Sequence, residues 1–199
     1  MAWTPEPDSA LLVIDVQRDF CPGGSLAVSE GDHVVPPLNA AAAGFAAVGR
    51  PVIATRDWHP PRTIHFREFG GPWPPHCVQG TPGAEFHPDL RLPPGTIVVS
   101  SGMGEDEDGY SAFEARDEGG REVADLLRDL GVKRLYMGGL ATDYCVKASV
   151  LDARQEGFAV TVLEDAVRGV NVQPGDDARA LDMMREAGAR VAPSASVVA

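Results

Sequence analysis

A strand, a glycine turn and a helix start follow one another in Leu135-Tyr136-Met137-Gly138-Gly139-Leu140-Ala141-Thr142-Asp143-Tyr144-Cys145-Val146. The apolar run predicts a buried strand, and the two glycines allow a tight turn into a helix expected over about residues 142–155. We expect Thr142 to cap this helix, which places Cys145 in its first turn. Backbone amides there favour a thiolate and can stabilise an oxyanion. Cys145 is therefore a candidate nucleophile, and the alternative is a buried packing cysteine.

The same alternation of short apolar runs and helical segments extends along the whole chain. Strands are expected at about residues 11–14, 52–55, 97–100, 135–137, 158–163 and 190–192, with helices at about 34–48, 121–130, 142–155 and 174–186. Buried strands that alternate with helices favour a parallel sheet with right-handed crossovers. We therefore expect a single α/β domain over residues 1–199, without an internal repeat or a linker.

Composition excludes several classes of function. The 199 residues include 29 Asp and Glu against 17 Lys and Arg, a net charge of −12 that opposes binding to nucleic acids and anionic membranes. The longest early apolar run, residues 10–14, is too short for a membrane span or an export signal, so we expect a cytoplasmic protein. The three cysteines are too few for a disulfide scaffold and indicate free thiols: Cys21, Cys77 and Cys145.

Polar residues stand where the predicted strands end. Asp15, Asp57 and Ser101 follow the first three strands, and residues 138–145 follow the fourth. In open α/β sheets, ligands bind beyond the carboxyl ends of the strands, so we expect these four segments to meet at one rim. Asp15 is then the candidate base for the thiol of Cys145.

The segment between the second and third predicted strands, residues 56–96, shows few helix or strand signals and holds four of the five histidines. A loop of that length in a compact domain usually has a function. It supplies a ligand set that one divalent ion, Zn²⁺, Fe²⁺ or Mn²⁺, would accept: Asp57, His59, His65 and His76. The alternative is that these histidines cap turns and bind no metal. The remaining histidines and one thiol are expected to be structural: His33, His87 and Cys77.

Five stretches of the chain carry a family resemblance: residues 14–26 (IDVQRDFCPGGSL), 57–59 (DWH), 73–84 (WPPHCVQGTPGA), 110–113 (YSAF) and 139–146 (GLATDYCV). Together they resemble nicotinamidases of the isochorismatase-like cysteine hydrolase superfamily, over about residues 10–192. The resemblance implies a six-stranded parallel sheet flanked by helices, in a Rossmann-like three-layer sandwich. It also implies hydrolysis of nicotinamide to nicotinate and ammonia for NAD salvage, with pyrazinamide-like analogues accepted. A homo-oligomer stays open.

The resemblance also implies a role for individual residues. The nucleophile and the general base correspond to Cys145 and Asp15. The ligands of a metal that holds the pyridine nitrogen, zinc foremost with iron or manganese as alternatives, correspond to Asp57, His59, His65 and His76. The walls of the ring pocket correspond to Phe20, Trp73 and Tyr110. The amides of the oxyanion hole correspond to Ala141 and Cys145, and the Leu140–Ala141 peptide bond is expected to be cis.

One position departs from the family pattern. Nine residues before the tyrosine of the YSAF stretch, where the family has a lysine that bridges the aspartate and the cysteine, this chain has Ser101. A short neutral serine cannot replace an ammonium group, and losing such a partner typically costs about 10²–10⁴ in rate. Four interpretations stay open: a slow nicotinamidase, an inactivated variant, a binder of nicotinamide or nicotinate without turnover, and a related hydrolase of another small amide.

Charged residues elsewhere do not fill this gap. The chain has only two lysines, Lys133 and Lys147, and we expect both to lie away from the site. The acidic run over residues 105–108 borders the predicted pocket. We expect it to be a solvated loop face.

Overall fold

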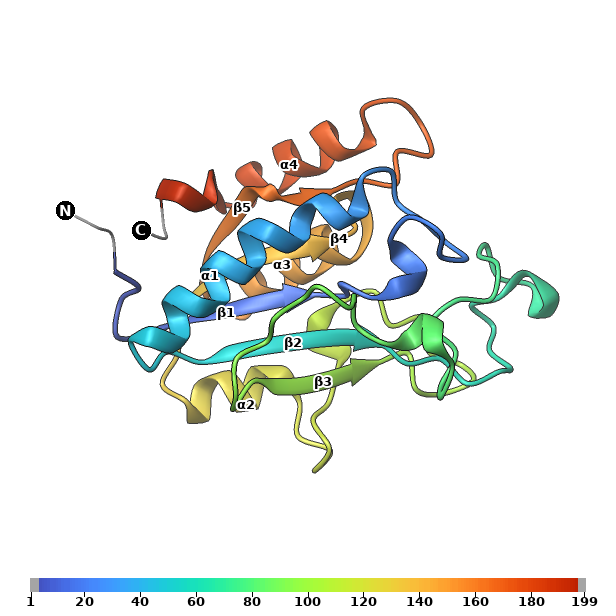
Figure 1. Ribbon diagram of the computed structural model, residues 1–199, viewed down its shortest axis with the longest axis horizontal. Helices are drawn as coiled ribbons and strands as arrows, with labels where there is room; N and C mark the ends of the chain where they lie inside the picture. Colours follow the sequence, from blue (N-terminus) through green and yellow to red (C-terminus); the bar gives the residue numbers. More distant parts are fainter. Residues whose placement is uncertain (1–3, 197–199) are drawn as a thin grey trace.

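One sheet of six strands runs through residues 4–196, the part of the chain that the computed structural model describes (Figure 1). The strands lie in the order β3-β2-β1-β4-β5-β6, and all neighbouring pairs are parallel. Their bounds are β1 (Ser9–Ile14), β2 (Val52–Asp57), β3 (Ile97–Ser101), β4 (Arg134–Leu140), β5 (Ala159–Arg168) and β6 (Arg190–Ala192). The predicted parallel α/β sheet is confirmed, and β2, β4 and β5 extend beyond their predicted ends.

Four α-helices of the described residues cover the two faces of this sheet: α1 (Val35–Ala47), α2 (Val123–Asp129), α3 (Lys147–Gln155) and α4 (Asp176–Glu186). Leu11 and Val13 of β1 pack with the residues of α1, which crosses in front of the sheet in Figure 1. Leu12 and Ile14 share the opposite core with α2, α3 and α4. Since successive side chains of a strand point to opposite faces, β1 is apolar at every position that a helix covers.

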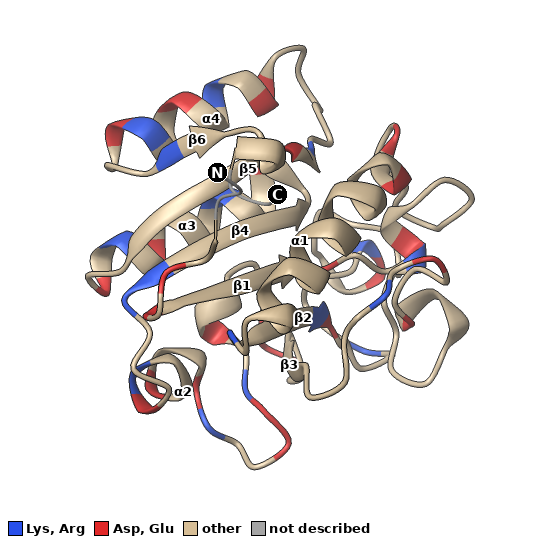
Figure 2. Cartoon of the chain, turned by 60° about the vertical axis from the view of Figure 1, so that its left-hand side comes forward, with Lys and Arg blue, Asp and Glu red and all other residues tan. Residues whose placement is uncertain are grey.

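Charge follows the same layering. Figure 2 shows acidic and basic residues on the helices and loops and on some strands, such as β2, whereas β1 carries none. Within residues 4–196, no helix combines the length and the apolar character that crossing a membrane requires. The central strand β1 is therefore uncharged, and the charged residues of the sheet lie on other strands, such as β2 and β5.

The helix after β4 begins with an unusual turn. Thr142–Val146 forms a turn of π-helix that continues directly into α3, so the predicted helix over residues 142–155 is confirmed. The expected cap is wrong: Ala141, extended at φ −100° and ψ 150°, occupies the N-cap position and makes no side-chain cap. Its carbonyl oxygen instead accepts from the N–H groups of Tyr144 and Val146. The Leu140–Ala141 peptide bond is cis, as the resemblance implies.

The long segment after β2 lies at the carboxyl end of the sheet, where the loops gather at the tips of the strand arrows (Figure 1). Its regular structure is limited to two short 3-10 turns, Arg67–Phe69 and Pro82–Ala84, and a few isolated bridges. The side-chain amide of Gln17 fixes it to β2 by donating to the carbonyls of Asp57 and Ala84 at 2.8 and 2.9 Å. These two buried hydrogen bonds hold the irregular segment in place although it contains no α-helix or named strand.

Gly139 marks the closest approach of β4 to β1. Its φ is +134°, and a Cβ there would lie 1.9 Å from the carbonyl oxygen of Ile14. Gly157 also has a positive φ, +88°, but nothing lies within 4 Å of its Cβ position. We expect Gly139→Ala to lower the free energy of unfolding by more than about 3 kcal/mol, and Gly157→Ala by about 1 kcal/mol. Urea unfolding followed by circular dichroism measures both, and equal losses would contradict the close contact.

Candidate active site

The carboxyl ends of four strands bring polar side chains to one place. Asp15 follows β1, Asp57 ends β2, Ser101 ends β3, and Cys145 lies in the turn after β4. All four residues are buried. One ligand atom each from Asp15, Asp57 and Cys145 lie within 4.8 Å of one another. Residues up to 130 positions apart in the sequence thus share one small site.

Thr55 orients the carboxylate of Asp15. Its hydroxyl donates to Asp15 Oδ1 at 2.5 Å and accepts from the backbone N–H of Asp15 at 3.2 Å. Asp15 has a left-handed φ of +49°, a conformation that aspartate tolerates better than most residues. The sequence prediction missed Thr55, although a signal existed: it stands two residues before Asp57 and therefore on the same face of β2.

The electrostatic surroundings favour the protonated forms of the acid and the thiol. Burial and the charge of Asp57 raise the pKa of Asp15, against the hydrogen bonds to Thr55 and Cys145. Burial and the carboxylates of Asp15 and Asp57 raise the pKa of the Cys145 thiol, against a backbone hydrogen bond to Ala141. Within residues 4–196, neither carboxylate pairs with a lysine or an arginine. A cation close to Asp15 and Cys145 would therefore lower the pKa values of both groups.

Ser101 does not take the place of such a cation. Its hydroxyl lies 3.4 Å from Asp57 Oδ1, and the residue is 2% exposed. Lys147 lines a separate surface hollow beside α4, and Lys133 precedes β4 at the amino end of the sheet. The expectation that both lysines lie away from the site is therefore confirmed.

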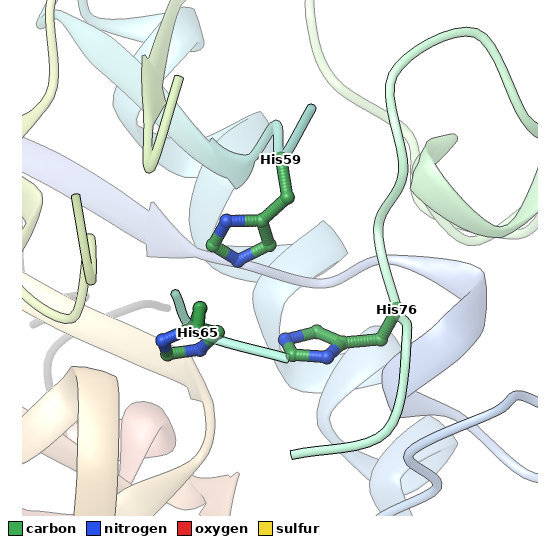
Figure 3. A group of neighbouring side chains, drawn as sticks. All are labelled: His59, His65 and His76. Carbon is green, nitrogen blue, oxygen red and sulfur yellow. The ribbon is translucent and has the colours of Figure 1, made fainter. Parts of the chain in front are cut away.

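Three histidines converge next to Asp57 (Figure 3). One ring nitrogen each from His59, His65 and His76 lie within 4.8 Å of one another, and all three residues are buried. In each ring Nδ1 faces an oxygen acceptor. Nδ1 of His59 lies 3.1 Å from the Gly102 carbonyl, and Nδ1 of His65 lies 3.2 Å from Asp108 Oδ1. Nδ1 of His76 lies 2.8 Å from the Pro74 carbonyl. Because these oxygens accept, Nδ1 carries the proton and Nε2 keeps its lone pair for a ligand.

The residues present fit a divalent metal ion. His59 Nε2 is buried and lacks a hydrogen-bond partner among the described residues, which is costly unless something else satisfies it. The Nε2 atoms of His59 and His76 lie 3.4 and 3.7 Å from Asp57 Oδ2. Burial raises the pKa of Asp57, but its contacts with His59 and His76 outweigh burial and hold the pKa well below its ordinary value. Three imidazoles and one ionised carboxylate are a suitable set for zinc, iron or manganese.

One cavity is lined both by the thiol-bearing Cys145 and by His65 and His76 of the histidine cluster. Asp57 also borders it, and apolar and aromatic side chains form much of its wall: Phe20, Leu26, Trp73, Tyr110, Tyr144 and Val170. Trp73 Nε1 donates to the Tyr110 hydroxyl at 2.8 Å, which fixes two of the three aromatic residues expected there. A cavity wall made largely of apolar and aromatic side chains suits a planar ring.

Sequence reasoning missed three of these wall residues, and two of them had a signal. Tyr144 directly precedes Cys145, and Val170 follows β5, so the strand-end rule extended to the fifth strand would have found it. The carboxylate of Asp143 accepts from the N–H of Val170 at 2.8 Å and holds this wall in position. Leu26 had no comparable signal.

The residues expected to be structural remain outside the site. His33 approaches Glu30 on the surface at 3.9 Å, and His87 Nδ1 accepts from the N–H of Asp89 at 3.2 Å. Cys77 is buried, and burial raises the pKa of its thiol. These contacts agree with structural roles.

The acidic run is a solvated loop face, as expected. Glu105, Asp106, Glu107 and Asp108 are all exposed. Asp108 in addition contacts the site, because its Oδ1 lies 3.2 Å from Nδ1 of the buried His65. The sequence did not indicate this contact, since the path of the loop decides it.

A parallel α/β sheet with a cysteine, an aspartate and a histidine cluster at its strand ends defines a class of hydrolases. The isochorismatase domain matches residues 9–196, and the chain belongs to this family. The nicotinamidase of Escherichia coli (strain K12) is 43% identical over 201 residues, covering 92% of this chain and 93% of that protein. The nicotinamidase/pyrazinamidase of Mycobacterium tuberculosis is 40% identical over 181 residues, covering 89% and 95%.

Solved structures agree with the family. The pyrazinamidase of Pyrococcus horikoshii in complex with zinc superposes with a TM-score of 0.87 at 48% identity, covering 94% of this chain and 99% of that chain. PnC1 from L. infantum in complex with nicotinate gives a TM-score of 0.87 at 34% identity, covering 100% and 99%. The six-stranded fold implied by the resemblance is therefore confirmed.

The histidine cluster generates a direct test of metal binding. We expect His59→Ala to weaken binding of Zn²⁺ by more than about 100-fold, since losing even an outer-shell partner typically costs about 10–100-fold. His33→Ala is the matched control, because this histidine lies on the surface away from the cluster. Competition with a chromophoric chelator measures the dissociation constants. Unchanged affinity in His59→Ala would remove that residue from the ligand set.

Proposed function

We propose that this chain hydrolyses nicotinamide to nicotinate and ammonia, and that pyrazinamide-like amides are further substrates. The observation that carries the proposal is a single cavity lined by Cys145, by His65 and His76 of the histidine cluster, and by aromatic side chains. A substrate with a planar ring, a basic ring nitrogen and a carboxamide matches these features: the ring suits the aromatic walls, the nitrogen suits the metal site, and the carboxamide suits the thiol. Relatives named as nicotinamidases, and the neighbour bound to nicotinate, support this substrate class.

The metal ligands in this proposal are Asp57, His59, His65 and His76. When bound, a divalent ion, zinc by analogy with the Pyrococcus neighbour, supplies a Lewis acid that holds the ring nitrogen of the substrate. The aromatic rings of Phe20, Trp73 and Tyr110 stack against the faces and edges of the substrate ring and exclude water. Together these groups present the carboxamide carbon to Cys145.

The first half of the reaction makes a thioester. Asp15 accepts the proton of the Cys145 thiol, and the thiolate attacks the carboxamide carbon. The negative charge that develops on the carboxamide oxygen accepts hydrogen bonds from the backbone N–H groups of Ala141 and Cys145. Asp15 then returns its proton to the amide nitrogen, the carbon–nitrogen bond breaks, and ammonia leaves.

The second half regenerates the enzyme. Asp15 takes a proton from a water molecule, which attacks the thioester carbon at the same site. The carbon–sulfur bond breaks, the Cys145 thiol recovers its proton, and nicotinate leaves. Thr55 keeps the Asp15 carboxylate aimed at both reactants through its hydrogen bond.

Ser101 favours one alternative function. Without a cation beside Asp15 and Cys145, the raised pKa values oppose formation of the thiolate. A chain of this kind can bind nicotinamide or nicotinate and turn it over slowly or not at all. Calorimetric binding of nicotinamide without ammonia release would favour the binder.

The role of Cys145 is tested by removing its sulfur. We expect Cys145→Ala to lower the rate of ammonia release from nicotinamide by at least about 10³-fold, because Cys145 is the only thiol among the described residues that line the cavity. Cys21→Ala is the matched control, since Cys21 is also a buried free thiol but lies outside the mechanism. A coupled ammonia assay measures both. Equal rates for Cys145→Ala and the parent chain would exclude Cys145 as the nucleophile.

The role of position 101 is tested by adding an ammonium group. We expect Ser101→Lys to raise turnover by about 10²-fold or more, since a cation there lowers the pKa values of both Asp15 and Cys145. Ser101→Ala removes the contact with Asp57 without adding charge, and we expect it to leave turnover close to that of the parent. Steady-state kinetics measure kcat. A folded Ser101→Lys variant with unchanged kcat would show that the missing cation does not limit the reaction.

A further inference from the structure

The loop between β3 and the YSAF stretch contacts the histidine cluster at several points. The carbonyl of Gly102 accepts from His59 Nδ1, and the carboxylate of Asp108 accepts from His65 Nδ1. The ring of Tyr110 packs edge-on against His65, with centroids 5.2 Å apart. This loop, residues 102–110, therefore forms the outer support of two of the three histidines.

Asp108 differs from the other supports in its charge. His59 and His76 donate to neutral backbone carbonyls, whereas His65 donates to a carboxylate. A carboxylate partner fixes the imidazole with its proton on Nδ1, orients the ring and makes Nε2 a stronger ligand. Of the three histidine supports, only this one can be removed by a side-chain substitution.

The backbone places Asp108 opposite His65. The N–H of Ile64 donates to the carbonyl of Glu105 at 2.9 Å, which joins the acidic run directly to the segment that carries His65. The side chain of His65 is 2% exposed and that of Asp108 is 58% exposed. Asp108 thus reaches the buried ring from the surface, so replacing it leaves no cavity in the core.

We propose that Asp108 is a positioning residue of the metal site. By accepting the Nδ1 proton of His65, it holds Nε2 toward His59 and His76 and tightens the binding of a divalent ion. The inference rests on the metal site of the proposed function. Metal affinity is measurable without turnover, however, so a failure of the proposed nicotinamide hydrolysis would not be mistaken for a failure of this role.

The test compares two charge-removing substitutions on the same loop. We expect Asp108→Ala to weaken Zn²⁺ binding by about 10–100-fold in competition with a chromophoric chelator. Asp106→Ala removes the same charge from an exposed residue that makes no hydrogen bond or ion pair with the three histidines in the described structure, and its affinity should match the parent's. Asp108→Asn keeps an acceptor oxygen but loses the charge, so its affinity should lie between those of the parent and Asp108→Ala.

Two outcomes would overturn the proposal. Unchanged Zn²⁺ affinity in Asp108→Ala would show that His65 needs no carboxylate support. Equal weakening in Asp106→Ala and Asp108→Ala would assign the effect to the net charge of the loop instead of a direct contact.

A kinetic readout separates positioning from a general structural role. With excess Zn²⁺, we expect kcat and KM of Asp108→Ala for nicotinamide to return to within about 2-fold of the parent values, because the loaded site regains its geometry. At limiting Zn²⁺, its activity should fall in proportion to metal occupancy. A loss of kcat that persists at saturating Zn²⁺ would show that Asp108 supports the loop and not the metal site.

Discussion

The buried carboxylate of Asp57 links the two halves of the site. One of its oxygens faces His59 and His76, and the residue also lies within reach of Asp15 and Cys145. A carboxylate at this depth is stable only with partners that share its charge. A divalent cation held by the same two histidines would meet that need, and the histidine cluster and the nucleophile are therefore parts of one electrostatic unit.

The group formed by Asp15, Asp57 and Cys145 has no positively charged side chain beside it in the described structure. The described residues place two carboxylates and a thiol together without a lysine or an arginine, and Ser101 offers only a hydroxyl to Asp57. Hydrogen bonds from Thr55 orient Asp15, but a hydroxyl does not neutralise it. A cation bound among the histidines would act on this cluster through Asp57, so the metal site bears on the acid–base balance as well as on the substrate.

Much of the fold and of the site's membership could be predicted from the chain. The alternation of apolar runs with helical segments predicted the parallel sheet, because both faces of β1 are covered and its positions 10–14 are all apolar. The rule that ligands bind at the carboxyl ends of parallel strands correctly predicted that four residues lie together: Asp15, Asp57, Ser101 and Cys145. The reason is that the carboxyl ends of parallel strands lie at the same edge of the sheet. Local details escaped prediction: Thr142 is not the helix cap, since the chain enters the helix one residue earlier at Ala141.

The sequence alone settled which chemical groups this protein carries and which edge of the sheet they share, because the hydrophobic period and the place of a residue at a strand end can be read locally. Which atoms face each other was decided by packing. The contact of Asp108 with His65 and the position of Val170 in the cavity wall depend on loops whose paths have no periodic signature. The hydrogen bond of Thr55 to Asp15 depends on the pairing of β2 with β1. Such contacts join residues far apart along the chain, so their geometry exists only once the sheet has brought the loops together.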